Sequence, residues 1–266
     1  MKMNRIAAIV YRQFCLIRGS FSRVISPFVW VAVDMVLWGF ITKYLNTVSK
    51  SGVNFVPTLL GAVLMWDFFV RVMQGVTTGF FEDVWSRNFI NFFSTPLLIP
   101  EYLCGLVIWS IVTSFLGLML MISVTSAFFG FSYFAYGMML VPFLLVLFLF
   151  GIGLGIFASA MVLRLGPSAE WFIWPIPALL SPFVGVFYPL STLPIWMQRI
   201  SYLLPPSYVF EGMRSIILQG SASWHGLFWG ATLAVLYIAL ACGFFTWIYR
   251  HAVRTGLIAR YSAESF

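Results

Sequence analysis

Residues 81–105 read FEDVWSRNFINFFSTPLLIPEYLCG and lie between two long apolar runs. Only 9% of the chain is charged, yet this segment gathers six charged or carboxamide side chains. They are Glu82, Asp83, Arg87, Asn88, Asn91 and Glu101. Because ionised groups are costly inside hydrocarbon, we expect residues 81–102 to form a solvent-facing segment on a membrane-embedded body. The partner that binds this segment is then expected to define the function.

The composition indicates what kind of body this is. Hydrophobic residues make up 61% of the 266 positions, and the mean hydropathy is +0.97, whereas a soluble domain is about 45–50% apolar. A soluble fold of this size has too little interior to bury so much apolar surface. We therefore expect an all-α polytopic membrane protein, folded as one transmembrane domain and in contact with membrane lipids.

Six apolar stretches are long enough to cross a bilayer as helices, which takes roughly 20 residues. They are residues 24–42, 56–80, 103–128, 137–162, 171–190 and 226–249. Residues 1–23 precede the first stretch, and one helix face there is apolar, formed by Ile6, Val10, Phe14 and Ile17. Arg5 and Arg12, seven residues apart, lie on another face. This pattern predicts an amphipathic helix in the cytoplasmic headgroup layer.

The basic residues predict how the spans are oriented. The formal net charge is +7, but the basic residues lie scattered near the ends of apolar runs, which argues against nucleic-acid binding. With the amino terminus inside, ten of them are cytoplasmic, four are outside, and Arg71 lies within the second span. The positive-inside rule then places both termini, residues 81–102 and the tail 250–266 in the cytoplasm.

The fourth span carries small residues at every fourth position, Gly151, Gly155 and Ser159. Such a stripe lets two helices pack closely in a membrane. Gly153, Gly155 and Ala158 also match a dinucleotide-binding fingerprint in form, but that motif needs a strand, a tight turn and a helix start. We therefore expect helix packing here.

Prolines interrupt the chain beyond residue 170. Each interior proline removes a helical hydrogen bond, and in a membrane such a break needs neighbouring protein or a water-filled cavity. The span 171–190, with four prolines, is therefore expected to face the bundle or a pathway. Residues 191–225 are too apolar for an ordinary loop and too broken to span. We expect a re-entrant hairpin at the outer leaflet, with short helices over 195–204 and 207–219.

Ionisable residues also occur inside the predicted spans. Asp34 lies near the centre of the first span, and the second span has a polar stripe of Asp67, Arg71, Gln74 and Thr78. Each is expected to face the bundle interior and to find a partner there. One interpretation is a buried ion-pair network, Asp34–Arg71 and Asp67–Arg71, and the other is a substrate- or proton-handling site. We favour the network, because a local i,i+4 acid–base pair already neutralises itself.

Sequence motifs for catalysis or metal binding are absent. There is no G-x-x-x-x-G-K-[ST] motif, and none of the three lysines lies in a glycine-rich loop. His225 and His251 are isolated, and the three cysteines show no CxxC spacing. We expect no catalytic residue, metal site or cofactor in this chain, and it is not expected to be an enzyme by itself.

The order of these parts resembles the permeases of ATP-binding-cassette (ABC) exporters of the type-two class. Those permeases have an interfacial cytoplasmic helix, six spans with both ends inside, and a coupling segment between the second and third spans. A re-entrant hairpin precedes their last span. The likeness extends over essentially the whole chain and is most specific in residues 80–105 and 188–214.

By this resemblance, residues 81–102 are the coupling segment that a cytoplasmic ATPase contacts. The residues expected to take part in coupling are Glu82, Asp83, Trp85, Arg87, Asn88, Phe89 and Pro96. Where many relatives have Gly-Thr-Leu-Glu after the basic residue, this chain has Asn-Phe-Ile-Asn over 88–91. The fifth span and the outer hairpin would form the exit gate, with residues Pro182, Pro189, Pro194, Pro205, Pro206 and Glu211.

The resemblance also implies partner subunits and a cellular location. Two copies of the chain, a homodimer, would assemble in a bacterial cytoplasmic (inner) membrane with two copies of a separate P-loop ATPase, which would bind ATP and Mg. Closure of the ATPase dimer would switch the cavity from inward- to outward-facing. Because 29 of the residues are phenylalanine, the expected cargo is amphipathic or apolar: a lipid, a glycolipid, a polysaccharide-lipid or a drug.

Two other classes of function stay open. One is a proton-coupled secondary transporter that uses Asp34, Asp67 and Arg71 as a relay. No internal repeat relates the two halves of the sequence, which argues against it. The other is a channel or an accessory scaffold subunit without a transport cycle.

Overall fold

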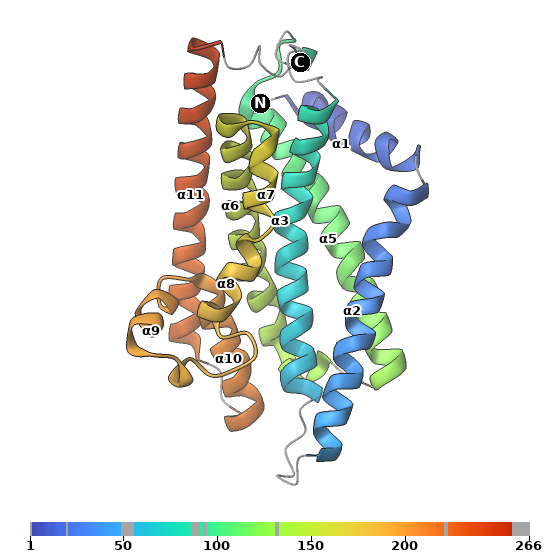
Figure 1. The fold of residues 1–266 in the computed structure, drawn as a ribbon, viewed down its shortest axis with the longest axis vertical. Coiled ribbons are helices and arrows are strands. Elements are labelled where there is room, and N and C mark those ends of the chain that lie inside the picture. The colour runs from blue at the N-terminus through green and yellow to red at the C-terminus, as the bar shows by residue number, and fades with distance from the viewer. Residues whose placement is uncertain are drawn as a thin grey trace.

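The fold is known from a computed structural model that describes residues 2–19, 21–48, 56–86, 91–92, 95–130, 133–220 and 223–256. Within these residues every regular element is a helix. Long helices run side by side along the longest axis of the molecule (Figure 1). The expectation of an all-α architecture is confirmed for this part of the chain.

Among the described residues, four helical stretches are long and apolar enough to cross a bilayer: Thr58–Trp85, Ile99–Phe129, Tyr136–Leu165 and Trp224–Arg254. They correspond to α3 (Gly61–Trp85) with the preceding η1 (Val56–Leu60), α5 (Ile99–Phe129), α6 (Leu140–Leu165) with η2 (Tyr133–Met139), and α11 (Trp224–Arg254). These stretches overlap the second, third, fourth and sixth predicted spans. α3 packs between α5 and α6, and α6 also packs against α11.

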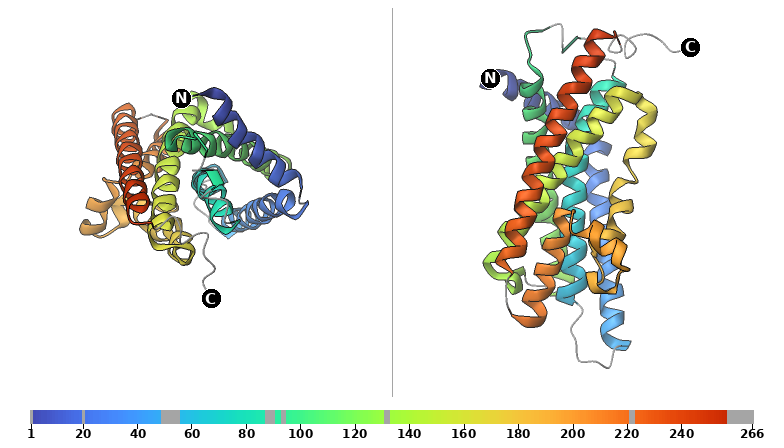
Figure 2. Two further views of the ribbon diagram at one scale, coloured as in Figure 1. Left: turned by 90° about the horizontal axis from the view of Figure 1, so that it is seen from above. Right: turned by 90° about the vertical axis from the view of Figure 1, so that its left-hand side faces the viewer.

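Two helices precede this group. α2 (Phe21–Val48) contains the first predicted span and extends beyond it at both ends, and it lies along α5. α1 (Met3–Arg18) lies across one end of the bundle (Figure 2). It is a helix separate from α2 and buries Ile6, Ile9 and Gln13, whereas Phe14 of the predicted apolar face is 52% exposed. The carboxyl end of α11 lies at the same end of the bundle as α1 (Figure 1).

The structure differs from the prediction at the fifth span, because no continuous helix crosses residues 171–190. A 3-10 turn, η3 (Pro167–Ala169), leads into α7 (Glu170–Ile173), and α8 (Ile176–Val184) follows after a break at Trp174–Pro175. α8 then ends at Gly185, whose φ of +68° is a left-handed conformation that glycine adopts readily. The prolines predicted a broken segment, and the break falls where Pro175 has no N–H to donate.

The segment beyond Gly185 folds as predicted into two short helices. η4 (Leu190–Thr192) leads to α9 (Ile195–Ser201) and α10 (Pro205–Gln219), in place of the expected 195–204 and 207–219. α10 packs against α6 and α11, at the end of the bundle away from α1 (Figure 1). A proline occupies the first or second position of α10 and precedes α9, where a missing N–H leaves no helical hydrogen bond unmade.

The small residues of α6 allow close approach to α3, which confirms the predicted packing stripe. A Cβ added at Gly151 would lie 2.9 Å from Val72 Cγ1, and one at Gly155 would lie 2.8 Å from Val76 Cβ. The second position is also only 2.9 Å from the carbonyl oxygen of Met73, which is backbone and cannot turn aside. Glycine is therefore required at Gly155 by the spacing of the two helices.

We predict that Gly155→Leu lowers the stability of the detergent-solubilised protein by about 1–3 kcal/mol, because the added side chain forces α3 and α6 apart. The measurement is the thermal unfolding midpoint. Gly243→Leu on α11 is the matched control, since no described atom lies within 4 Å of a Cβ added there. An equal loss in the two variants would contradict a packing role for Gly155.

Candidate functional site

Two ion pairs join α1 to the adjoining ends of α3 and α5. Arg12 pairs with Asp83 in the last turn of α3, and Arg5 Nη1 lies 3.1 Å from Glu101 Oε2 in the first turn of α5. The two carboxylate residues are only 0% and 1% exposed. Buried carboxylates require a counter-charge or hydrogen-bond donors, so these pairs determine where α1 lies.

This burial corrects the expectation that residues 81–102 face solvent throughout. Residues 81–85 complete α3 and residues 99–102 begin α5, so the connection between the helices is shorter, residues 86–98. Asp83 and Glu101 are covered because α1 folds over them and supplies both arginines. Charge alone predicted exposure, but the covering helix comes from a distant part of the sequence.

The remaining predicted residues of this segment are placed as follows. Trp85 is 51% exposed, Pro96 is exposed and Glu82 is half-buried. Arg87, Asn88 and Phe89 lie outside the described residues. Of the predicted coupling residues that the structure describes, Trp85 and Pro96 are therefore exposed, whereas Asp83 is buried.

Asp83 connects more than one pair of elements. The hydroxyl of Tyr102 on α5, itself fully buried, donates a hydrogen bond of 2.6 Å to Asp83 Oδ2. The Arg12 guanidinium also lies 4.7 Å from the centre of the Phe92 ring, within the range of a cation–π contact. One carboxylate thus holds together α1, α3 and α5.

Glu101 is held by more donors than Asp83 is among the described residues. Its Oε2 accepts a hydrogen bond from the backbone N–H of Leu98 at 3.1 Å, which completes the start of α5. Its Oε1 accepts another from the backbone N–H of Lys2 at 2.8 Å. Loss of the Arg5 guanidinium would therefore leave this carboxylate with two hydrogen bonds.

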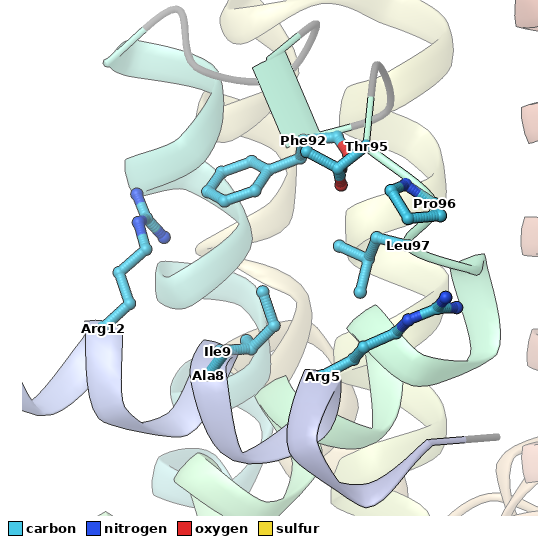
Figure 3. Close-up of a pocket in the computed structure, with 8 residues that line it drawn as sticks. All are labelled: Arg5, Ala8, Ile9, Arg12, Phe92, Thr95, Pro96 and Leu97. Atoms are coloured by element: carbon cyan, nitrogen blue, oxygen red, sulfur yellow. Dashed lines mark hydrogen bonds between the residues drawn. The ribbon is translucent and has the colours of Figure 1, made fainter.

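A pocket of about 260 Å³ opens between α1 and the residues that lead into α5. Its lining residues are Arg5, Ala8, Ile9, Arg12, Phe92, Thr95, Pro96 and Leu97. Figure 3 shows the four residues of α1 on one side of the pocket and Phe92, Thr95, Pro96 and Leu97 on the other. The pocket therefore adjoins both ion pairs at the same end of the bundle.

A second polar cluster lies deeper in the bundle. The side chains of Asp34 on α2 and of Asp67 and Arg71 on α3 lie close enough to interact electrostatically. Arg71 also packs on α5, since a Cβ added at Gly117 would lie 3.0 Å from Arg71 Cδ. The predicted residues Asp34, Asp67 and Arg71 are thus brought together, and Gln74 lies half-buried about one turn from Arg71 on α3.

Of the predicted outer residues, Glu211 contacts a buried arginine, Arg214, that the sequence reasoning did not select. Arg214 Nη1 on α10 donates a 2.8 Å hydrogen bond to the carbonyl oxygen of Gly185 at the end of α8. Glu211 Oε1 accepts from Arg214 Nη2 at 3.3 Å and from the backbone N–H of Leu190 at 2.8 Å. Glu211 therefore has a direct role in this cluster, whereas the prolines act through the backbone.

The sequence reasoning also missed Arg5, Arg12 and Tyr102 as site residues. A signal was available, because residues seven apart lie on the same face of a helix after about two turns. Arg5 and Arg12 have this spacing. Lipid headgroups explained these arginines equally well, so the spacing did not identify buried carboxylates as their partners.

Comparison with known proteins assigns the sequence to a family. A sequence model described as ABC-2 type transporter matches residues 4–218, which include most of α1, both polar clusters and the outer helices. The chain belongs to the ABC-2 type transporter family. It is therefore the permease component of an ABC transporter, and membership implies that the permease partners with an ABC ATPase. No curated protein matches the chain.

We predict that Arg12→Ala destabilises the permease by about 2 kcal/mol, and Arg5→Ala by less than about 1 kcal/mol. Arg12→Ala leaves Asp83 buried with only the Tyr102 hydroxyl among its described hydrogen-bond donors, whereas Glu101 keeps two backbone donors. The measurement is the unfolding midpoint in detergent. Adding Asp83→Asn to Arg12→Ala removes the unpaired charge and should recover part of the loss. An equal effect of both arginines would count against this assignment.

The intramembrane cluster gives a second prediction for the permease. Asp34→Arg alone and Arg71→Asp alone should each reduce the yield of folded protein, because each places like charges together without a counter-charge. The free-energy cost of one unpaired ion in the middle of a membrane is about 2.5–3.5 kcal/mol. The double variant restores opposite charges across α2 and α3. Size-exclusion yield from membranes measures the outcome, and absence of recovery in the double variant would refute pairing between these helices.

Proposed function

We propose that this permease is the transmembrane subunit of an ATP-driven exporter that moves an amphipathic or apolar cargo out of the cytoplasm or the inner leaflet. The observation that carries the proposal is the joint formed by Arg12–Asp83 and Arg5–Glu101. Residues 86–98 leave α3 and return to α5 at this joint. Force applied to this connection would act on α1, α3 and α5 together.

In this proposal the partner ATPase binds ATP and Mg, and the permease converts closure of the ATPase into movement of its helices. The buried side chains Asp83 and Tyr102 keep the ends of α3 and α5 together while the connection moves. Trp85, half exposed beside them, offers a surface for contact with the ATPase. The resulting change is a rigid-body transition between two arrangements, biased by ATP.

Contacts along α3 support a path from this joint to the outer helices. α3 has 25 residues and is thus about 37 Å long. Near its other end, the Trp66 ring lies 6.2 Å from the Phe210 ring of α10. α10 in turn holds the end of α8 through Arg214 and the Gly185 carbonyl. Movement of α3 could therefore be transmitted to the proposed exit gate.

The proposed assembly is a homodimer with two ATPase subunits in a bacterial cytoplasmic membrane. α2 exposes the large apolar side chains of Trp30, Leu37 and Phe40, which need lipid or a second copy to cover them. α1 and the end of α11 lie at one end of the bundle (Figure 1), which supports placing both on the same side of the membrane; the basic residues favour the cytoplasm as that side. The proposed cargo class, a lipid, glycolipid, polysaccharide-lipid or drug, rests on the abundance of phenylalanine.

One observation favours a second candidate function. Asp34 and Asp67 lie beside Arg71 within the helix bundle, and a proton-coupled secondary transporter would need such a cluster of ionisable groups. In that function the energy would enter at mid-membrane, and no ATPase would be required.

We predict that the tagged permease, purified from its native membrane, carries a P-loop ATPase in equimolar amount, and that deletion of residues 86–92 abolishes this association. The deletion removes the first seven residues of the connection that would contact the ATPase, while leaving both carboxylates of the joint in place. Quantitative mass spectrometry measures the ratio. Deletion of seven residues from the carboxyl tail, 258–264, is the matched control and should leave the ratio unchanged.

Proteoliposomes separate the two candidate functions. The exporter transports cargo only with ATP and continues when the proton gradient is collapsed. Transport that needs the gradient and proceeds without ATP would overturn the proposal in favour of the proton-coupled function.

A further inference from the structure

The seam between α6 and α11 ends in a group of basic and aromatic side chains that the proposed function does not use. Arg164 is the only charged residue of α6 and lies one residue before its end. Its guanidinium carbon is 5.8 Å from the centre of the Trp247 ring on α11, within the range of a cation–π contact. The ring of His251, one turn further along α11, stacks with Trp247 at 6.4 Å between ring centres. Two helices thus contribute to one cluster.

The arginines of this cluster have no acidic partner among the described residues. Arg164 and Arg254 are exposed, and neither forms an ion pair with a described carboxylate. Arg254 lies seven residues after Trp247 and therefore on the same face of α11. Arg5 and Arg12, in contrast, are neutralised by buried carboxylates. The two exposed guanidinium groups beside Trp247 are therefore suited to bind an anion.

The tryptophans of α11 place this cluster at the surface of the membrane. Trp229 and Trp247 are 47% and 57% exposed, and the 17 residues between them include no charged side chain and no histidine. The two tryptophans are about 27 Å apart along the helix, close to the roughly 30 Å of hydrocarbon in a bilayer. Because tryptophan is enriched at both membrane–water interfaces, Trp247 marks one of them. Arg254 lies about 10 Å further along the helix, at the depth of the lipid headgroups.

This side of the bundle is open to lipid. Of the four described stretches that could span a membrane, α11 is the least buried. It lies on the opposite side of the bundle from α2 (Figure 1). On the hydrocarbon side of Trp247, the Phe244 ring stacks with Phe157 of α6 at 5.3 Å between ring centres. The seam therefore offers an apolar surface for acyl chains directly below the basic group.

We propose that this end of the α6–α11 seam binds the headgroup of an anionic phospholipid. Arg164 and Arg254 donate hydrogen bonds to the phosphate, and the acyl chains lie along Phe157 and Phe244. Basic pockets between transmembrane helices bind anionic headgroups in this way. A zwitterionic lipid fits less well, because its ammonium group would meet two unneutralised guanidinium groups. The inference goes beyond the proposed function, since it holds whichever energy source drives transport.

Lipid titration of the purified, delipidated permease tests the proposal, with native mass spectrometry as the measurement of affinity. The wild type should bind phosphatidylglycerol about tenfold more tightly than phosphatidylcholine, or better. Arg164→Gln should weaken phosphatidylglycerol binding about fivefold, the effect of one cationic side chain at a membrane surface, and leave phosphatidylcholine binding unchanged. Arg199→Gln is the matched control, since it removes the same charge from an exposed position on α9. Its affinity should stay within about twofold of the wild type.

A photocrosslinking benzoylphenylalanine gives a second readout that keeps both arginines. In place of Trp247 it should capture phosphatidylglycerol from the membrane well above the share of that lipid. In place of Trp229 it should capture lipids in proportion to their abundance, because residues 224–249 of α11 include no arginine. This comparison decides the proposal even where Arg164→Gln does not fold.

Three results would refute an anionic-lipid site. They are equal affinity of the wild type for the two lipids, an equal loss in Arg164→Gln and Arg199→Gln, and proportional capture at both crosslinking positions. A fourth result would assign the cluster to a protein partner instead: Arg164→Gln keeps the wild-type affinity for phosphatidylglycerol but loses a co-purifying ATPase in lipid-free detergent.

Discussion

The buried carboxylate of Asp83 is the constraint on which the α1 end of this permease depends. An acidic side chain at the end of an apolar helix is unfavourable unless charged or polar groups surround it. Arg12 and Tyr102 provide those groups from α1 and α5. The apolar contacts of α1 alone are few, since Ile6 and Ile9 are its only buried apolar side chains among the described residues. Electrostatic pairing therefore sets the position of α1 across the helix ends.

Close packing in the middle of the bundle gives that joint a rigid support. In a membrane there is little hydrophobic driving force between helices, so van der Waals contact at small residues does most of the work. Gly151 and Gly155 let α6 approach the backbone of α3. One well-packed helix, α3, therefore has the joint with Asp83 at one end and the contact of Trp66 with Phe210 near the other. A displacement at one end is transmitted rather than absorbed.

The sequence predicted those features that depend on local pattern. Long apolar runs predicted α3, α5, α6 and α11, and prolines predicted the short helices α9 and α10. What it could not predict depends on contacts between distant segments. Asp83 and Glu101 were expected in solvent, because nothing within residues 81–102 shows that Arg12 and Arg5 would cover them. The prolines of 171–190 predicted a break but not its position, since Pro177 and Pro182 are accommodated within α8 while Pro175 is not.

The arrangement of charge along α3 bears on where energy enters the permease. Asp67 and Asp83 are sixteen residues apart, so about 24 Å of the same helix separates the mid-membrane cluster from the joint. A proton-driven cycle would use Asp34 and Asp67 and would need no ionic joint between α1 and the ends of α3 and α5. A buried ion pair contributes little net stability compared with an apolar pair of similar size. The presence of two such pairs at one end of the bundle is therefore better explained by a need to hold α1 in one position than by a need for stability. Placement matters most where a partner applies force, and this favours energy entering from the ATPase at the Asp83 end of α3.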